Sequence, residues 1–189
     1  MLTDEQKQKN LNLFLRKLNE VGVDTSVLQE KYSDLILNAS FALTNETFSA
    51  YEGSLLNTIL RVFIPYAVQL NAILHDSIKV PNETLIKVCL LHQISKIQMF
   101  TLNENEWERE KRGMVYKYAP YEYAFKMGMR SIILCQECGI DLTPLEIEAM
   151  TILDRDVTDE QARFRCNPLS VIIRQASEIT NLQLKNLKN

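Results

Sequence analysis

Residues 54–74 read SLLNTILRVFIPYAVQLNAIL, and this stretch decides the expected fold. Its apolar side chains fall on nearly every face of a helix, a pattern typical of a segment that is buried on all sides. We therefore predict a long central helix over residues 54–74. Pro65 lies inside it and has no backbone N–H, so it should kink or interrupt the helix there.

The segments on either side of the central helix also show helical periodicity. Ser26 and Gln29 are spaced as a capping box, and Thr143, Pro144 and Glu146 combine an N-cap, a first-turn proline and an acidic third residue. Together with apolar spacing, these signals place the flanking helices. The predicted helices span residues 3–21, 24–38, 82–100, 121–138, 144–154 and 167–187.

Residues 101–119 break the helical pattern. Aromatic side chains between Trp107 and Tyr118 flank the tight turn sequence at residues 111–113, which predicts a short two-stranded hairpin. The polar stretch 39–50 reads as a connection, and the charged stretch 155–166 as a surface loop or a short helix. The expected fold class is therefore all-α, with one small β-hairpin.

Composition limits the classes of function that the chain can have. With 189 residues, 46% of them hydrophobic, we expect one domain over residues 1–189, whose N-terminal helices occupy residues 1–44. A net charge of −3 argues against a protein that binds nucleic acid or an anionic membrane through its overall charge. No apolar run approaches the roughly 18 residues of a membrane span, and the polar N-terminus lacks a signal-peptide core. We expect a cytoplasmic protein.

The counts of histidine and cysteine narrow the chemistry further. There are 2 His residues, His75 and His92, so a site built on several imidazoles is excluded. Cys135 and Cys138 form a lone Cys-x-x-Cys pair, whereas a zinc site needs four ligands. We expect these two cysteines to be free thiols, in the core and partly exposed, because a bridge within one helix would strain the backbone.

The run 89–96 reads CLLHQISK and resembles the core signature of the HD-domain superfamily, which comprises metal-dependent phosphohydrolases with an all-helical fold. His92, Ile94, Ser95 and Lys96 match that signature, and Gln93 stands where the family has Asp. Other segments resemble those of a bacterial and phage branch in the same order. These segments are 51–60, 107–118, 126–131, 142–143 and 168–177. The resemblance implies an HD-like helical core over residues 45–187.

The family binds one or two divalent metals through His and Asp side chains, and the metal activates a bound water. The resemblance places the ligand positions at Thr58, His92, Gln93, Met127, Leu153 and Ser177. Only one of these side chains is an imidazole and none is a carboxylate. Met and Leu cannot hold a hard cation, and neutral amides and hydroxyls are poor substitutes for carboxylates. The resemblance therefore implies no metal, no other cofactor and no catalytic residue.

Three functional hypotheses follow from this resemblance. The first is a catalytically inactive relative, a pseudo-hydrolase kept as a binding or regulatory module. Its degenerate pocket would bind a ligand through Thr58, His92, Gln93, Lys96, Arg130 and Ser177. Lys96 and Arg130 match basic positions of the family and favour an anionic small molecule, while a protein partner and self-association remain open.

The second hypothesis is an active phosphohydrolase whose metal is held by an unconventional carboxylate set, namely Glu52, Asp154 and Glu178. The third is a protein-interaction domain in which side chains fill the former pocket. Metal content and turnover of phosphate esters separate the second hypothesis from the other two.

Overall fold

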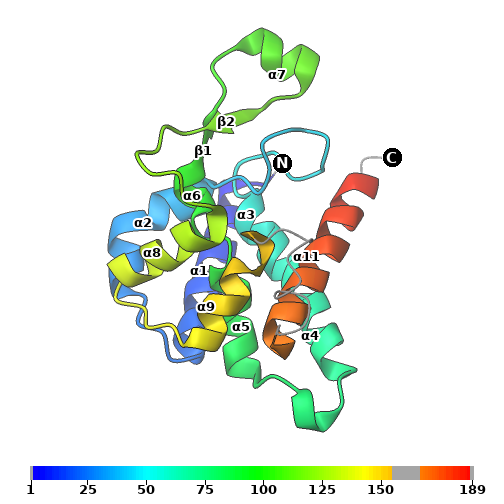
Figure 1. Ribbon diagram of the computed structural model, residues 1–189. Coiled ribbons are helices and arrows are strands. Elements are labelled where there is room, and N and C mark those ends of the chain that lie inside the picture. The colour runs from blue at the N-terminus through cyan, green and yellow to red at the C-terminus, as the bar shows by residue number, and fades with distance from the viewer. Residues whose placement is uncertain (1, 155–166, 188–189) are drawn as a thin grey trace.

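The computed structural model describes residues 2–154 and 167–187, and in these ranges its regular elements are helices apart from one two-stranded sheet (Figure 1). This confirms the predicted all-α class with one small hairpin. The first half contains α1 (Asp4–Glu20), α2 (Ser26–Asn38), α3 (Ser54–Thr58), the π-helical turn η1 (Ile59–Phe63), α4 (Ile64–Ala72) and the 3₁₀ turn η2 (Asp76–Ile78). The second half contains α5 (Asn82–Leu91), α6 (Lys96–Met99), β1 (Phe100–Leu102), α7 (Glu106–Arg112), β2 (Tyr116–Tyr118), α8 (Met127–Glu137), α9 (Pro144–Thr151), the 3₁₀ turn η3 (Ile152–Asp154) and α11 (Pro168–Asn186).

The predicted central helix is the succession of α3, η1 and α4. Leu55, Ile59 and Phe63 are fully buried along it, as its all-round apolar pattern predicted. The π-helical turn η1 ends at Phe63, and Pro65 lies in the first turn of α4, where its missing N–H cannot bond to the preceding turn. The interruption expected at this proline is thus a local widening of the helix.

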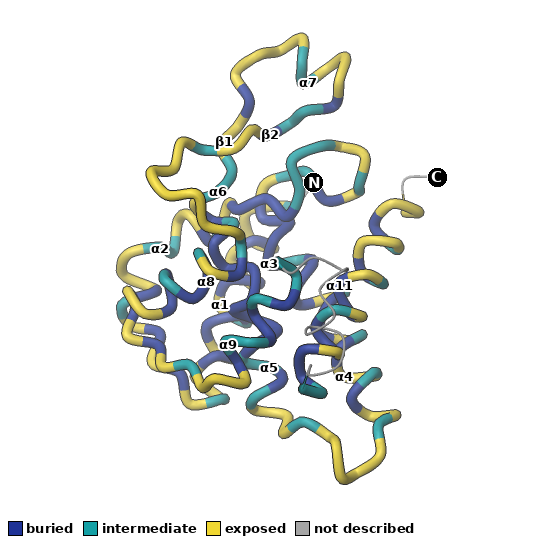
Figure 2. Tube along the Cα trace, in the orientation of Figure 1, coloured by how far each residue is buried: buried dark blue, intermediate teal, exposed yellow. Residues whose placement is uncertain are grey.

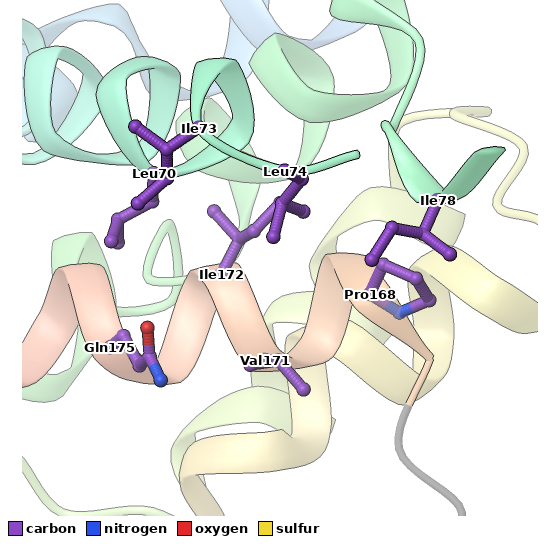
Figure 3. A pocket seen from close by; sticks show the side chains of 8 residues that line it. All are labelled: Leu70, Ile73, Leu74, Ile78, Pro168, Val171, Ile172 and Gln175. Atoms are coloured by element: carbon purple, nitrogen blue, oxygen red, sulfur yellow. The ribbon is translucent and has the colours of Figure 1, made fainter. Parts of the chain in front are cut away.

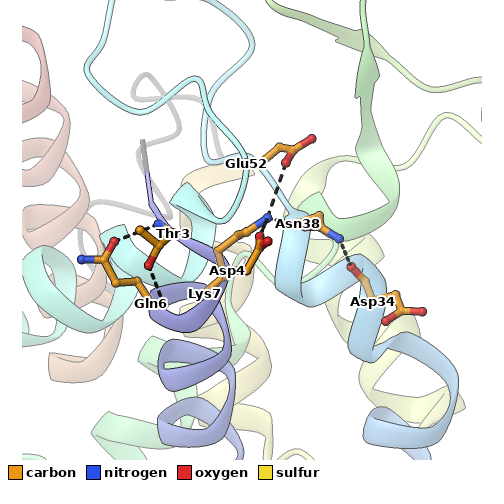
Figure 4. Close-up of polar contacts among 7 residues, drawn as sticks. All are labelled: Thr3, Asp4, Gln6, Lys7, Asp34, Asn38 and Glu52. Carbon is orange, nitrogen blue, oxygen red and sulfur yellow. Dashed lines mark hydrogen bonds and ion pairs between the residues drawn. The ribbon is translucent and has the colours of Figure 1, made fainter.

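The other helices surround this central segment. Helix α1 packs against α2, α3 and α5, while α4 packs against α5 and α11, and α9 lies against α5, α8 and α11. Figure 2 shows buried residues concentrated where these helices meet. Helix α1 begins with a capping box between Thr3 and Gln6, which satisfies donors of its first turn (Figure 4). None of the helices in the described ranges has the length and apolar character needed to cross a membrane.

The hairpin differs from its prediction. Its strands β1 and β2 pair antiparallel, with Thr101 opposite Lys117, but helix α7 lies between them. Asn105 caps α7 through Glu108 N–H, and Gly113 ends it in the left-handed region with φ +66°. The expected turn at residues 111–113 is therefore a helix end. Acidic residues in the first turn of α7 and basic residues in the last favour this helix through its dipole.

Three further helix boundaries also differ. The predicted helix 82–100 breaks into consecutive turns over residues 92–95. Helix α8 begins at Met127 and not near residue 121. At the start of α2, Ser26 is not part of a capping box, because its N–H donates to Asp24 Oδ1. The predicted loop or short helix at 155–166 lies outside the described residues.

Candidate functional site

The six positions that the resemblance places at a metal site lie on elements that pack together. Thr58 ends α3, Gln93 follows α5, and Met127 begins α8. Leu153 lies in η3 and Ser177 in α11. Helices α5 and α11 both contact η1, and α8 and α11 both contact η3. The fold thus brings the relevant elements into one region.

The signature segment forms a tight chain of turns between α5 and α6. Ile94 N–H donates to Leu91 O, and Lys96 N–H donates to Gln93 O, each over three residues. The Ser95 hydroxyl donates to Met127 O at 3.0 Å, and the Ser131 hydroxyl donates to Ser95 Oγ at 2.9 Å. A small polar residue at position 95 therefore joins the signature turns to α8.

His92 is completely buried, with an exposed fraction of 0%. Its Nδ1 lies 3.0 Å from Cys89 O, and because a carbonyl only accepts, Nδ1 must carry the proton. Its ring stacks on Phe63, with centroids 4.3 Å apart. Burial, with a smaller contribution from the nearby charge of Lys96, lowers the pKa of His92 from 6.5 to about 3, against the opposing effect of the Cys89 hydrogen bond. The imidazole is therefore a neutral core group at physiological pH.

Two neighbouring acceptor atoms in this region are buried without a hydrogen-bond partner in the described ranges. They are His92 Nε2 and Gln93 Oε1. The hydroxyl-bearing side chains Thr58 and Ser177 are also buried, with exposed fractions of 2% and 6%. None of these four groups carries a negative charge at neutral pH, so they cannot compensate the charge of a divalent ion.

The two cations predicted to bind an anion have protein partners of their own. Lys96 Nζ donates to Phe41 O at 2.7 Å and lies 3.7 Å from the centroid of the Phe41 ring. Burial lowers the pKa of Lys96 from 10.5 to about 7. Arg130 Nε donates to Phe125 O at 2.9 Å, and its guanidinium carbon lies 3.8 Å from the centre of the Tyr121 ring. Each cation therefore anchors an aromatic segment.

The unconventional carboxylate set is not gathered at one place. The side chain of Glu52 is 66% exposed and pairs with Lys7, and Glu178 is exposed on α11. Asp154 Oδ2 accepts Met129 N–H at 3.2 Å and so caps the first turn of α8. Over residues 2–154 and 167–187, no three His, Cys, Asp or Glu side chains are grouped as a metal site.

The sequence did not indicate two features of this region. One is the stacking of Phe63 on His92, which pairs residues from distant segments. The other is the close approach of Gly128 to α9, where an added Cβ would lie 2.3 Å from Met150 O and 2.7 Å from Asp154 Oδ2. A glycine in the interior of the helix predicted over residues 121–138 was the available signal for this contact.

An apolar cavity of about 230 Å³ lies apart from the six positions, between α4, η2 and α11 (Figure 3). Gln175 is the sole polar residue in its lining. Ile78 and Pro168 also line an adjoining cavity of about 440 Å³. The first cavity offers no charged group that could recognise phosphate.

The cysteines are free where the structure describes them. Cys135 and Cys138 are unbridged, as predicted, but both are buried rather than partly exposed, because they face the core between helices; Cys89 is also free and buried. Burial raises the pKa of Cys135 to about 12, which suppresses the reactive thiolate. The cysteine pair therefore forms part of the core.

Comparison of the chain with protein-family models, curated proteins and solved structures found no match. The resemblance to the HD-domain superfamily accordingly rests on the residues quoted from the sequence.

Proposed function

We propose that this protein is a non-catalytic, HD-like helical protein, a pseudo-hydrolase that works as a binding or regulatory module for a partner protein. The observation that carries the proposal is the packing of His92. The one ligand-type side chain retained from the family pattern is fully buried, neutral and stacked on Phe63. It is used as a core residue.

The charge distribution around His92 supports the same proposal. A catalytic divalent ion needs several anionic or imidazole ligands and an open coordination position. The nearby charge that acts on His92 is that of Lys96, which in its protonated form would repel a metal ion. Gln93, Thr58 and Ser177 contribute neutral oxygens only.

Metal analysis of the purified protein, together with turnover of phosphomonoesters and nucleotides, tests this proposal. We expect no stoichiometric manganese, iron, nickel or zinc, and no turnover above background. Gln93→Asp should not create activity, because the other ligand positions stay neutral. About one equivalent of metal, lost together with activity in His92→Ala but retained in the surface variant His75→Ala, would identify an enzyme instead.

A second candidate function is the binding of a small anion near Lys96. One observation favours it: among the described residues, no carboxylate forms an ion pair with this half-buried cation. Titration with inorganic phosphate, followed by amide chemical shifts, tests the candidate. Binding should disappear in Lys96→Met and persist in the exposed control Lys117→Met. Equal shifts in both variants would reject a site at Lys96.

A cytoplasmic location belongs to the same proposal. The free thiols of Cys89, Cys135 and Cys138 support it, because reduced cysteines persist in reducing compartments. A fusion to a fluorescent protein, followed by fractionation of the cells, tests the location.

A further inference from the structure

The hairpin that carries α7 has two outer edges, and hydrogen-bond alternation shows which backbone groups face them. Asn103 N–H donates to Val115 O, and Ala119 N–H donates to Met99 O. In an antiparallel pair, bonded and non-bonded residue pairs alternate. Thr101 therefore bonds to β2 across the hairpin, whereas the N–H and C=O groups of Phe100 and Leu102 point away from it.

The two edges differ in how they are covered. On the β2 side, Tyr116 N–H donates to Leu43 O at 2.9 Å, and Asn45 N–H donates to Gly113 O at 2.8 Å. The connection around residues 43–45 thus closes that edge. On the β1 side, the outward backbone groups of Phe100 and Leu102 have no hydrogen-bond partner among residues 2–154 and 167–187, and Leu102 is 54% exposed. Figure 1 shows this hairpin projecting from the helical body.

A cavity of about 340 Å³ lies against one face of the hairpin, where Leu102 of β1 lines it together with Val115 and Tyr116. Leu102 and Tyr116 face each other in register, so their side chains lie on the same face of the hairpin. The lining residues of the cavity are Leu2, Lys7, Ala50, Tyr51, Glu52, Leu102, Val115 and Tyr116. A strand added to β1 would place a side chain beside Leu102 on the face of the hairpin that lines this cavity.

The charge next to this cavity is negative. Lys7 Nζ is shared between Asp4 Oδ1 at 2.9 Å and Glu52 Oε2 at 3.5 Å, and it also donates to Asn38 Oδ1 (Figure 4). One buried cation thus faces two carboxylates. The side chains of Asp4 and Glu52 are 96% and 66% exposed, so the surplus negative charge faces solvent. The negative charge of Asp4 and Glu52 beside the cavity would attract the basic side chains of a partner.

We propose that an extended segment of a partner protein, with alternating apolar and basic side chains, binds by adding a strand to the outer edge of β1. The outward groups of Phe100 and Leu102 bond to its backbone, an apolar side chain enters the cavity, and Lys or Arg side chains meet Asp4 and Glu52. This inference rests on the proposed binding role and names the partner's chemistry. It does not depend on whether the chain holds a metal.

The test uses a blocked synthetic peptide of alternating lysine and valine and the full chain, observed by amide hydrogen exchange in NMR spectra. Without peptide, the Phe100 and Leu102 amides should exchange quickly and the Thr101 amide slowly. Saturating peptide should slow exchange at Phe100 and Leu102. A peptide methylated at alternate backbone nitrogens, and one with glutamate in place of lysine, should each bind at least about tenfold more weakly.

Leu102→Pro is the decisive variant. It removes an N–H that points outward, and proline is tolerated on edge strands for that reason. The hairpin should persist, seen in a still protected Thr101 amide, while peptide affinity falls at least about tenfold. Leu102→Ala also shortens the side chain that lines the cavity but keeps the N–H. It is the matched comparison, and its loss of affinity should be smaller than that of Leu102→Pro, with peptide still slowing exchange of the amide at residue 102.

Four results would overturn the proposal. The first is no peptide binding, and the second is binding that survives both Leu102→Pro and backbone methylation. The third is tighter binding of the glutamate peptide. The fourth is protection of the Phe100 amide without peptide that grows with protein concentration. The last result would assign the edge to a second copy of the chain. Metal content and turnover are measured separately, so failure here is distinguishable from failure of the non-catalytic proposal.

Discussion

The imidazole of His92 lies against the ring of Phe63, with centroids 4.3 Å apart and planes inclined by 26°. His92 belongs to the turns after α5, and Phe63 ends the π-helical turn of the central segment. Because the contact is buried and His92 Nε2 has no hydrogen-bond partner in the described part of the chain, protonation would place an uncompensated charge in the core. The contact therefore couples stability to pH.

Lowering the pH should destabilise the protein through His92. The pKa of His92 is about 3 in the folded state against 6.5 for an ordinary histidine. Between these values the unfolded state binds the extra proton, so the contribution is complete above pH 6.5 and is lost as the pH falls toward 3. Over this range the contribution of His92 to the free energy of unfolding falls by about 1.4 kcal/mol for each pH unit. Urea unfolding of the wild type and of His92→Leu measures it as the difference between their slopes.

Carboxylates also titrate in this range, so the comparison between variants is essential. His75→Gln is the control, because His75 is exposed and contacts Ser77 locally. Its pH dependence should parallel that of the wild type. An equal slope in wild type and His92→Leu would mean that His92 is not buried in its neutral form.

Breaking the ion pair between Lys87 and Glu146 should be costly. Lys87 Nζ lies 3.1 Å from Glu146 Oε1, and the Glu146 side chain is 4% exposed. Lys87→Met leaves this carboxylate buried without its cation and should lower the free energy of unfolding by about 3 kcal/mol. Chemical denaturation measures the loss.

The exposed pair of Lys9 and Glu5 is the matched control for that variant. Their side chains are 71% and 77% exposed at a distance of 2.7 Å, so Lys9→Met should change stability by less than about 0.5 kcal/mol. Similar losses for Lys87→Met and Lys9→Met would contradict the buried role of the first pair.

Gly128→Ala should disturb the contact between α8 and α9. Its new Cβ would meet Met150 O at 2.3 Å and Thr151 Cα at 2.9 Å, both backbone atoms that cannot rotate away. We expect a loss of at least about 2 kcal/mol on unfolding, as for overpacked cores. Gly139→Ala meets no atom within 4 Å and strains only a φ of +69°, so it should cost about 1 kcal/mol. Thermal unfolding of both variants measures the two losses of stability. If Gly128→Ala loses less stability than Gly139→Ala, the close approach of Gly128 to α9 is refuted.

The core thiols should be unreactive in the folded protein. Burial raises the pKa of Cys89 and Cys135 and keeps both side chains away from solvent. Iodoacetamide at neutral pH should therefore modify these two residues only after unfolding, as read by peptide mass spectrometry. In guanidinium without reductant, all 4 cysteines of the chain should be labelled. Recovery of fewer thiols would indicate a disulfide.

Local signals in the sequence determined most of the helices and their caps. Thr143 and Glu146 form the predicted capping box, Asn167 caps α11, and Gly139 follows α8 with a positive φ. These interactions join residues only a few positions apart, so their spacing is visible in the chain. The same holds for Pro65, whose effect on the helix depends on its own missing N–H.

The remaining helix boundaries needed tertiary contacts. Helix α8 begins at Met127 because Asp154, more than twenty residues later, caps its first turn. Residues 92–95 leave the helix where Ser95 is joined to α8 by hydrogen bonds. The spacing of apolar residues predicts only which face of a helix is buried. It cannot predict hydrogen bonds to residues that are distant in the chain.

The sequence by itself determined an all-α fold with one small hairpin, and the residue types at the six positions that the resemblance assigns, which include few metal ligands. Only the tertiary structure decided that His92 stacks on Phe63 and that Lys96 binds Phe41 O. It also decided that residues 43–45 close the β2 edge, while no other part of the described chain bonds to the β1 edge. The physical reason is distance along the chain. Residue types and local spacing fix helices and their ends, whereas burial, pKa and free backbone edges depend on which remote segments the folded chain brings together.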